Sequence, residues 1–471
     1  MLRNRSPGMK LFLAALVGVA LIVPLLMVYG LVSDRQHQAR VAQDTITAGS
    51  GGAQVISGPV LVIPYRDNRT TVEMVDGRSV TRTVEVRSHI YLSPETQDIA
   101  TTLEPERKRK AIYETVIYLA DMTGTARFAL PDDLQRYGVT RDRLILDEAQ
   151  IRFGTSDPRG LRAAAQLAVN GEAVALKPGD GVAASGGAGF HGFLDWSAGD
   201  PLAVEWSYTL RGSRSVTLVP RGGQTDWKVS SAWAHPGFSG SFLPDQSDIS
   251  ADGFTASWSI GNLALGQSMV MERDPGPPMV GEAGAIAMPV EMAMERGEAP
   301  AGPSMAASIS LIDPVDVYSQ VDRAVKYGFL FIGFTFLAYL MFDIIGGARV
   351  AAAEYLLTGA GLVLFFVLLL ALAEVIGFTL AYILASAAVI GLLTAYSAAV
   401  LKSWLRARVI GALLVGLYAL LYVLLSLEAF SLLIGSLLLF AALAGVMYAT
   451  RGVDWSSVAG QRDEEDTGAI A

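Results

Sequence analysis

The stretch that decides the fold is Leu11–Val32, LFLAALVGVALIVPLLMVYGLV, which runs for 22 residues without a charged side chain. About 20 apolar residues in a helix cross the hydrocarbon core of a bilayer, so this stretch predicts a membrane anchor. Arg3, Arg5 and Lys10 precede it, as in a signal peptide. The apolar run is long, however, and no A-x-A-like cleavage site follows it, which favours an anchor that is not cleaved.

Five further apolar runs follow close together in the C-terminal part of the chain. Single charged residues separate them, and each of these charges would be costly in the middle of a bilayer. Hydrophobic residues make up 52% of the 471 residues and charged residues only 17%, which is too apolar for one water-soluble domain. We therefore predict an integral membrane protein whose residues 326–450 form a bundle of five transmembrane helices. Their expected ranges are 327–345, 355–373, 375–401, 409–427 and 429–449.

The distribution of basic residues predicts the orientation. With a cytoplasmic N-terminus, nine basic residues lie on the cytoplasmic side, and the two short outer turns hold only Glu374 and Glu428. An excess of Lys and Arg in cytoplasmic loops is typical of membrane proteins. Residues 1–10 and the acidic tail 451–471 are then expected in the cytoplasm, and residues 33–325 in the periplasm of a bacterial inner (plasma) membrane protein. The nine residues are Arg3, Arg5, Lys10, Arg349, Lys402, Arg406, Arg408, Arg451 and Arg462.

Residues 33–325 have the composition of a large, mainly antiparallel β domain. They hold 26 Lys and Arg against 36 Asp and Glu, a net charge of -10. Short β-branched or aromatic segments bounded by Gly, Pro, Asp or Asn are typical of strands, so we expect a sandwich-like domain. One short helix is expected at Pro131–Tyr137. The strand candidates are Ala53–Tyr65, Ala111–Ala120, Leu202–Leu210, Ser215–Pro220 and Phe254–Ile260.

The residue content argues against several kinds of chemistry. The chain has no cysteine, which excludes disulfides, cysteine-ligated metals and thiol catalysis, and it has only four histidines. The usual serine hydrolase, penicillin-binding, zincin and P-loop motifs are absent. We therefore predict no catalytic residue, no cofactor and no metal site, and no nucleic acid partner.

Three weaker signals have an ordinary structural interpretation. Gly187–Gly192 matches G-x-G-x-x-G by letter, but a dinucleotide site would need a preceding strand and a following helix, so a turn is expected. His235 has no second ligand in register and is expected to be a packed strand residue. Arg107–Lys110 could contact anionic lipid head groups, although a solvated entry to a strand is the simpler interpretation.

Residues 268–305 contain seven of the 14 methionines among Pro, Gly, Ala and Glu. Thioether sulfur is a soft ligand, so Cu(I) binding is one interpretation. No His or Cys joins the methionines, and this composition does not build a core. We expect a flexible insert.

Two groups of side chains are candidate structural or interaction positions. Trp233, His235, Phe238, Phe242 and Trp258 could line a groove for lipid or glycan, or form the core of the sandwich. At the entry to the bundle, polar and aromatic side chains could anchor the chain at the interface or transmit a signal. This second group is Tyr318, Arg323, Lys326 and Tyr327, with Glu374 as a boundary residue.

The predicted transmembrane helices carry no ionisable residue at mid-helix, which argues against ion-coupled transport. Small residues at Ala387, Gly391, Ala395 and Ala399 recur every four residues and are expected to form a packing seam. A transporter or lipid-handling protein remains an alternative, and a polar cavity would favour it. That cavity would be lined by Ser386, Thr394, Tyr396 and Ser397.

Several longer stretches resemble the CreD family of bacterial inner-membrane proteins. The similarity lies in the sequence segments GPVLVIPY, RKRKAIYE, LRGS, SAWAHPGFSGSFLP, GFTASW, PVDVY, RAVKYGFLF and LLLALAEVIGF. They begin at Gly58, Arg107, Leu210, Ser231, Gly253, Pro314, Arg323 and Leu368. Ala111 and Asp343 depart from the family pattern, where we expect Gly and Glu.

The resemblance covers nearly the whole chain and implies one anchor, a periplasmic domain and a C-terminal bundle. It also implies a role in cell-envelope integrity and in the response to envelope or cell-wall stress, without a known enzymatic activity. We expect a non-enzymatic protein whose partners are the lipid bilayer and an envelope protein, lipid or glycan. A third hypothesis, a membrane-anchored cell-wall hydrolase, would require two outer-domain acids in one cleft about 5–10 Å apart.

Overall fold

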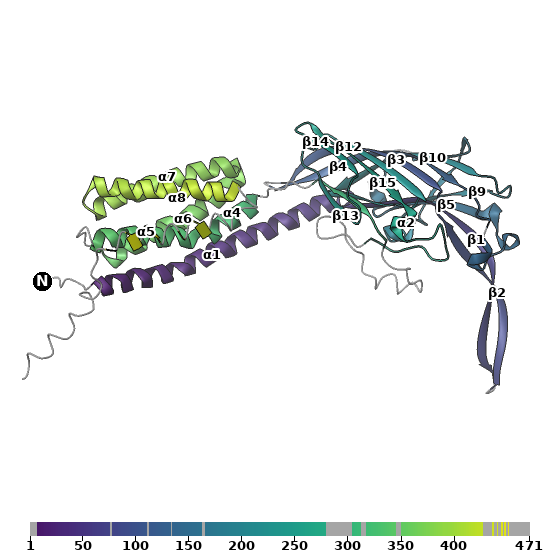
Figure 1. Ribbon diagram of the computed structural model, residues 1–471, viewed down its shortest axis with the longest axis horizontal. Coiled ribbons are helices and arrows are strands. Elements are labelled where there is room, and N and C mark those ends of the chain that lie inside the picture. Colours follow the sequence, from purple (N-terminus) through teal and green to yellow (C-terminus); the bar gives the residue numbers. More distant parts are fainter. Residues whose placement is uncertain are drawn as a thin grey trace, which may run out of the picture. The chain divides into compact units, whose positions relative to one another are not determined.

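The computed structural model divides the chain into two compact units (Figure 1). Residues 1–40 and 315–471 form the helical unit, and Val41–Pro314 form the β domain. The structure describes residues 7–75, 78–110, 113–132, 134–162, 165–278, 304–311, 317–344, 350–426, 436–437, 440, 444–445, 447–448 and 451.

Five helices among the described residues are long and apolar enough to cross a membrane. The first is α1, whose apolar part is the stretch that predicted the anchor, and it continues to Ala48 because polar residues with good helix propensity follow. The expected segment 429–449 lies largely outside the described residues. The helices are α1 (Pro7–Ala48), α4 (Val317–Lys326), α5 (Gly328–Ile344), α6 (Ala352–Ile376), α7 (Phe378–Val400) and α8 (Trp404–Ser426), and α4 and α5 together make one candidate span.

The break between the second and third helices of the expected bundle lies at Gly377, after the predicted position at Glu374. Gly377 has φ +79°, a backbone conformation that favours glycine, and both α6 and α7 meet there. Glu374 stays inside α6 because its carboxylate has polar neighbours, so the helix need not end at the charge.

The predicted packing seam on α7 is wrong. Ala387, Gly391, Ala395 and Ala399 are exposed, and a Cβ added at Gly391 would meet no atom within 4 Å. The buried face of α7 instead carries Ala381, Ala385, Val389, Leu393 and Ser397. Both rows repeat every four residues, so periodicity alone did not identify the packed face.

The β domain contains two sheets, as predicted for a sandwich. The nine-stranded sheet has the order β13-β17-β11-β1-β5-β9-β8, with β2 paired to β1 and β16 paired to β2. Its strands are β1 (Gln54–Val75), β2 (Arg78–Leu92), β5 (Ala149–Thr155), β8 (Leu176–Pro178), β9 (Gly189–Leu194), β11 (Ser215–Val219), β13 (Gly237–Gly240), β16 (Val270–Met271) and β17 (Ala307–Ser310).

The eight-stranded sheet has the order β14-β15-β12-β3-β4-β10-β6-β7, so β14 and β7 are its edges. Its pairings are antiparallel except for β12 with β3, and in the other sheet only β1 with β11 is parallel. Its strands are β3 (Thr96–Lys110), β4 (Tyr113–Phe128), β6 (Gln166–Val169), β7 (Glu172–Ala173), β10 (Leu202–Ser213), β12 (Gln224–Ser231), β14 (Gln246–Ser250) and β15 (Gly253–Gly261).

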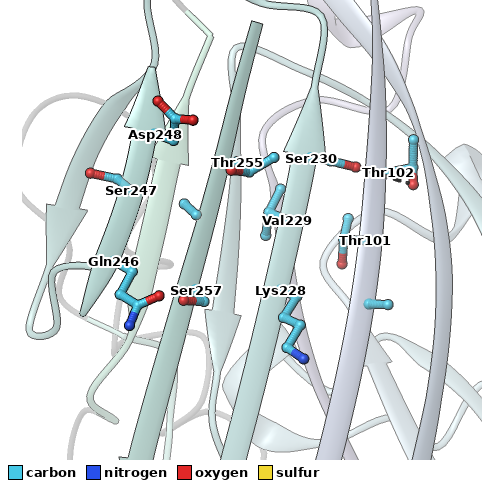
Figure 2. A pocket seen from close by; sticks show the side chains of 12 residues that line it. Thr101, Thr102, Lys228, Val229, Ser230, Gln246, Ser247, Asp248, Thr255 and Ser257 are labelled. Carbon is cyan, nitrogen blue, oxygen red and sulfur yellow. Dashed lines mark hydrogen bonds between the residues drawn. The ribbon is translucent and has the colours of Figure 1, made fainter. Parts of the chain in front are cut away.

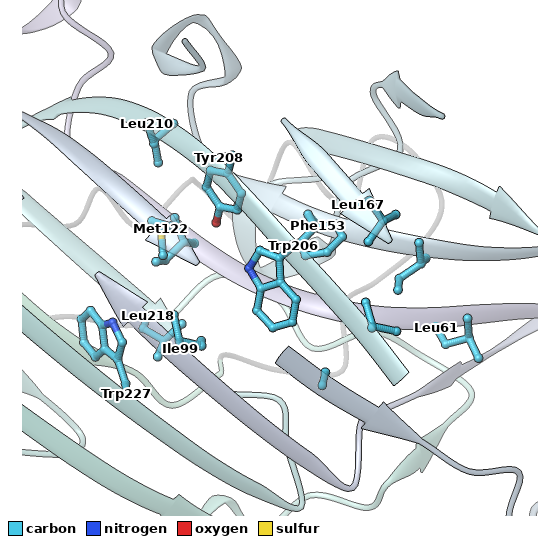
Figure 3. Close-up of a cluster of buried hydrophobic side chains, with 14 of the residues drawn as sticks. Leu61, Ile99, Met122, Phe153, Leu167, Trp206, Tyr208, Leu210, Leu218 and Trp227 are labelled. Atoms are coloured by element: carbon cyan, nitrogen blue, oxygen red, sulfur yellow. The ribbon is translucent and has the colours of Figure 1, made fainter. Parts of the chain in front are cut away.

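The core lies between the two sheets (Figure 3). Phe153 on β5 and Trp206 on β10 meet across it with ring centroids 5.6 Å apart, and Trp227 stacks on Trp258 within one sheet at 4.6 Å. Alternation along β3 and β10 points every second side chain into this core, because successive side chains of a strand lie on opposite faces.

Short helical turns join the strands. The helix expected at Pro131–Tyr137 is a single 3-10 turn, because the polar segment is too short to offer an amphipathic face. The turns are η1 (Leu134–Tyr137), η2 (Arg141–Arg143), η3 (Leu146–Glu148), η4 (Pro158–Gly160), η5 (Ala183–Ser185) and α2 (Asn262–Leu265).

Candidate functional site

A polar groove of about 550 Å³ lies on the solvent face of the eight-stranded sheet (Figure 2). Strands β14, β15, β12 and β3 form it side by side, with the edge strand β14 as one border. Its lining residues are Ala100, Thr101, Thr102, Lys228, Val229, Ser230, Gln246, Ser247, Asp248, Thr255, Ala256 and Ser257.

Strand alternation explains why this face is polar. On β15, Phe254, Ala256 and Trp258 are buried, so Thr255 and Ser257 face the solvent. On β12, Trp227 and Val229 are buried in the same way, which leaves Lys228 and Ser230 on the groove side. The signal was present in the strand candidate at 254–260, whose alternate residues are hydroxyl-bearing, but period-2 polarity also describes an ordinary solvent face.

The groove offers hydroxyl, amide, ammonium and carboxylate groups in one place. The hydroxyls of Thr102 and Ser230 lie 3.5 Å apart, and Lys228 forms no ion pair with any described residue. Gln246 and Asp248 on β14 face it from the edge, opposite Ser257 and Thr255 in the register. Such a surface can hydrogen-bond an extended polar ligand.

Two acidic residues meet beside the groove. The Ser259 hydroxyl donates to Asp226 Oδ1 at 2.5 Å, and the Ser259 amide donates to Asp245 Oδ2 at 2.7 Å. The Gln224 amide also reaches the Ser259 hydroxyl, at 2.7 Å. A wall hydrolase would require a pair of outer-domain acids, but here both carboxylates accept hydrogen bonds from one serine and act as a brace between β12, β15 and the segment before β14.

The predicted aromatic group is mostly core. Trp233 and Trp258 are buried, and Phe238 and Phe242 pack against the core cluster, so these four do not line the polar groove. His235 is exposed in the loop before β13, which makes its prediction as a packed strand residue wrong. The loop turns because the Trp233 indole donates to the His235 carbonyl at 2.9 Å, which leaves the imidazole outside.

Of the predicted residues at the entry to the bundle, Tyr318 contacts Glu374. The Glu374 side chain is 13% exposed, its Oε1 accepts from the Tyr318 hydroxyl at 3.2 Å, and Arg35 Nε lies 4.0 Å away. Glu374 thus contacts side chains of α1 and α4 from its position on α6. The sequence predicted only a residue at the boundary of a helix.

The remaining entry residues lie on or just after α4. Lys326 is exposed and pairs with Asp322 at 2.6 Å, one helical turn earlier. Arg323 is half-buried, and Tyr327 occupies the link between α4 and α5. These positions are consistent with anchoring and carry no arrangement of reactive groups.

The weaker sequence signals have clear positions. Gly187–Gly192 leads into strand β9, not into a helix, as the turn interpretation requires. Arg107–Lys110 is the exposed end of β3, with its charges partly paired to Glu106 and Glu114. Most of the tract 268–305 lies outside the described residues. Its base is held where Ser304 donates to the Gly276 carbonyl through both its amide, at 3.2 Å, and its hydroxyl, at 2.7 Å.

Two buried ion pairs were not predicted. Arg221 is buried in the β domain and donates to Asp274 Oδ1 at 2.6 Å and to the Ser57 hydroxyl at 3.0 Å. In the helical unit, Lys10 Nζ lies 2.9 Å from Asp343 Oδ1. The partners are 53 and 333 residues apart, so no local pattern could have revealed them.

Two of the residues proposed for a transport cavity bond to protein groups. Ser397 is fully buried and bonds the Tyr339 hydroxyl, whereas the Ser386 hydroxyl donates to the Ile383 carbonyl of its own helix, at 3.0 Å. An apolar groove of about 370 Å³ lies elsewhere in this unit, between α1 and α5. Among the described residues, no three or more His, Asp or Glu gather as a possible metal site.

Comparison with known proteins agrees with this architecture. The family model described as inner membrane protein CreD matches residues 6–456. The inner membrane protein CreD of Escherichia coli (strain K12) is 30% identical over 444 residues, which cover 92% of this chain and 90% of that protein. Both the helical unit and the β domain fall within the match. The chain belongs to the CreD family of inner membrane proteins.

Proposed function

We propose that this protein contributes to the integrity of the bacterial cell envelope under envelope or cell-wall stress, without enzymatic activity. In this proposal the termini are cytoplasmic, the β domain is periplasmic, and this domain binds an envelope partner through the polar groove. The basic residues flanking the apolar helices support the orientation. The observation that carries the binding proposal is the groove together with the exposed edge strand that borders it.

An extended polypeptide is the partner chemistry that this arrangement fits best. All five residues of β14 are exposed, and the strand has one neighbour, β15, in the sheet. Edge strands present backbone N–H and C=O groups that can pair with an added strand, which is a common mode of peptide recognition. Alternate side chains of the added strand would then extend past Gln246 and Asp248 toward the groove, where only long side chains would reach the hydroxyls of Thr255 and Ser257 and the Lys228 ammonium group.

Site-specific photocrosslinking in intact cells tests the binding proposal. A photoreactive residue at Gln246, on β14, is expected to give a protein adduct of defined mass. Glu172, on the opposite edge strand β7, is the matched control position and is expected to give none. Lys228→Ala, combined with the Gln246 probe, is expected to reduce the adduct. Adducts with lipid alone would overturn the partner proposal.

The orientation has a separate test. A reporter enzyme active only in the periplasm, inserted near Asp200, is expected to be active. Activity only from a cytoplasmic reporter at the same site would overturn the topology and, with it, the proposed envelope partner.

A further inference from the structure

Both connections of the β domain to the membrane helices leave it from the same edge. The Gln43 amide, on the last part of α1, donates to the Glu114 carbonyl at 2.9 Å, and Asp44 pairs with Arg214 at 2.8 Å. Leu311, the last described residue after β17, donates its amide to the Arg214 carbonyl at 2.6 Å. Only residues 312–316 separate Leu311 from α4, and five residues span at most about 18 Å.

The basic run Arg107–Lys110 lies at this edge. It forms the end of β3 and pairs with Tyr113–Val116 at the start of β4. Val116 accepts a hydrogen bond from the Arg214 amide at 3.1 Å, and Glu114 is the residue that Gln43 contacts. The basic run is therefore one strand away from the points where both connections are held.

The charges of this edge are opposite to those of the rest of the domain. Arg107 and Arg109 share one carboxylate, Glu114, at 3.8 and 3.7 Å, and Lys108 pairs with Glu106 at 2.8 Å. The hydrogen bond from Lys108 lowers the pKa of Glu106. Lys110 forms no ion pair with any described residue. Four cations and two anions leave +2, whereas the whole β domain has 23 basic and 33 acidic residues, or -10.

An aromatic side chain supports the basic run. The Arg107 guanidinium lies 5.2 Å from the centroid of the Trp233 ring, a cation–π arrangement that orients the arginine while 53% of its side chain stays exposed. A fixed guanidinium matches the geometry of phosphate oxygens better than a freely rotating ammonium group does. Basic residues with a neighbouring Trp are also typical of protein surfaces at the level of lipid head groups.

We propose that this edge, made of Glu106–Lys110, Glu114 and Trp233, binds the phosphate groups of anionic lipids on the surface of the membrane that the helical unit spans. The covalent connections limit the distance of the edge from the bilayer, because Gln43 is eleven residues, or about 16 Å of helix, beyond Val32 at the end of the apolar stretch. The local positive charge selects anionic head groups. This binding is independent of the polar groove, which lies on β3, β12, β14 and β15 and uses hydroxyl groups. Each basic residue near an anionic surface contributes roughly a fivefold preference, so the net charge of +2 predicts an about thirtyfold preference for the bound position.

The absence of cysteine allows a direct test with the full-length protein in liposomes. A fluorophore is placed on Ala232→Cys, an exposed position next to Trp233, and a quencher is carried on the lipid head groups. Bilayers of phosphatidylcholine alone are compared with bilayers containing one third phosphatidylglycerol. The test variant is R107Q/K108Q/R109Q/K110Q. The matched control, R66Q/R82Q/R136Q/R141Q, removes four exposed charges elsewhere in the β domain.

Quenching is expected to be at least twofold stronger with phosphatidylglycerol, and this difference is expected to vanish in the test variant. About 0.5 M NaCl should also remove it, because the Debye length then falls to about 4 Å. The control variant should keep the difference. Equal quenching in both bilayers for the unmodified protein would overturn the proposal. Loss of the difference in the control variant would overturn it as well, because overall charge would then be the cause.

Discussion

The two buried ion pairs differ in how completely their carboxylate oxygens are hydrogen-bonded, although Arg221 Nη1 in the β domain also has no partner among the described residues. In the β domain, Asp274 uses both oxygens, one for Arg221 and one for the Ala183 amide at 2.5 Å. In the helical unit, Asp343 Oδ1 bonds Lys10, but its Oδ2 has no hydrogen-bond partner among the described residues. The side chains of Asp274 and Asp343 are 6% and 1% exposed, so burial does not explain the difference.

The availability of backbone amides explains the difference between Asp274 and Asp343. Ala183 begins a short 3-10 turn, and its amide is free to bond a carboxylate because no earlier turn of helix requires it. Amides inside a transmembrane helix are already bonded four residues back along the chain, so they cannot serve a buried acid. A carboxylate among membrane helices therefore needs another side chain as its hydrogen-bond donor. A carboxylate in the β domain can also accept hydrogen bonds from the backbone amides of loops.

Breaking the Arg221–Asp274 ion pair in the β domain is expected to cause the largest loss of stability. Arg221→Met leaves Asp274 buried without its cation, and such changes cost about 3–5 kcal/mol. Denaturant unfolding of the full-length protein in detergent, followed by tryptophan fluorescence, measures it. The double variant R221M/D274L is expected to recover most of the stability, since neither charge remains. If the double variant is as unstable as the single one, packing and not charge is the main contribution of Arg221.

In the Lys10–Asp343 pair of the helical unit, substituting Lys10 is expected to cost more stability than substituting Asp343. Lys10→Met leaves a buried carboxylate and is expected to cost about 2–3 kcal/mol. Asp343→Asn leaves Lys10, whose side chain is 24% exposed and can reach water, so about 1 kcal/mol is expected. Thermal unfolding in the same detergent compares them. Equal losses of stability in the two variants would show that the Lys10 ammonium group cannot move into water.

Two glycines extend the comparison to packing. A Cβ at Gly124 on β4 would meet the Trp206 ring and lie 2.7 Å from the Asp98 carbonyl, so Gly124→Ala is expected to cost about 1–3 kcal/mol. At Gly359 on α6 the nearest atom is the end of the Leu21 side chain, which can rotate. Gly359→Ala is therefore expected to cost less than about 1 kcal/mol. Unfolding measurements compare the two variants. Similar losses of stability for Gly124→Ala and Gly359→Ala would mean that the helices are as rigid as the sheets.

The smallest effect is expected for Tyr318→Phe. It removes one hydrogen bond to Glu374 but leaves Arg35 nearby, and hydrogen bonds between membrane helices contribute about 0.6 kcal/mol. Glu374→Gln, which also loses the charge, is the companion variant in the same thermal unfolding measurement. A loss for Tyr318→Phe above about 2 kcal/mol would indicate that the α4–α6 contact controls the stability of the whole helical unit.

The sequence predicted the architecture well because its signals are local. Uncharged runs of about 20 residues predicted α1, α5, α6, α7 and α8, and alternating β-branched and aromatic residues predicted β1, β4, β10, β11 and β15. Parallel pairing of β1 with β11 and of β3 with β12 was not predictable, since strand neighbours distant in sequence leave no short-range pattern.

The candidate site was predicted less well. The aromatic residues around Trp233 were expected to form either a ligand groove or the core, and burial places most of them in the core. Thr255, Ser257 and Lys228 are common residue types on a solvent face, and only the assembled sheet shows that they border one groove. Glu374 was identified by its charge, but its contacts with Tyr318 and Arg35 depend on three helices that the sequence separates.

The hydrogen bonds between Gly276 and Ser304 have a practical consequence for protein engineering. They bring the two ends of a 27-residue segment together. The free energy needed to bring the two ends of a chain segment together rises only slightly as the segment lengthens. An affinity tag or a fluorescent domain spliced between these two residues should therefore be tolerated, and it would provide a handle on the protein away from both termini.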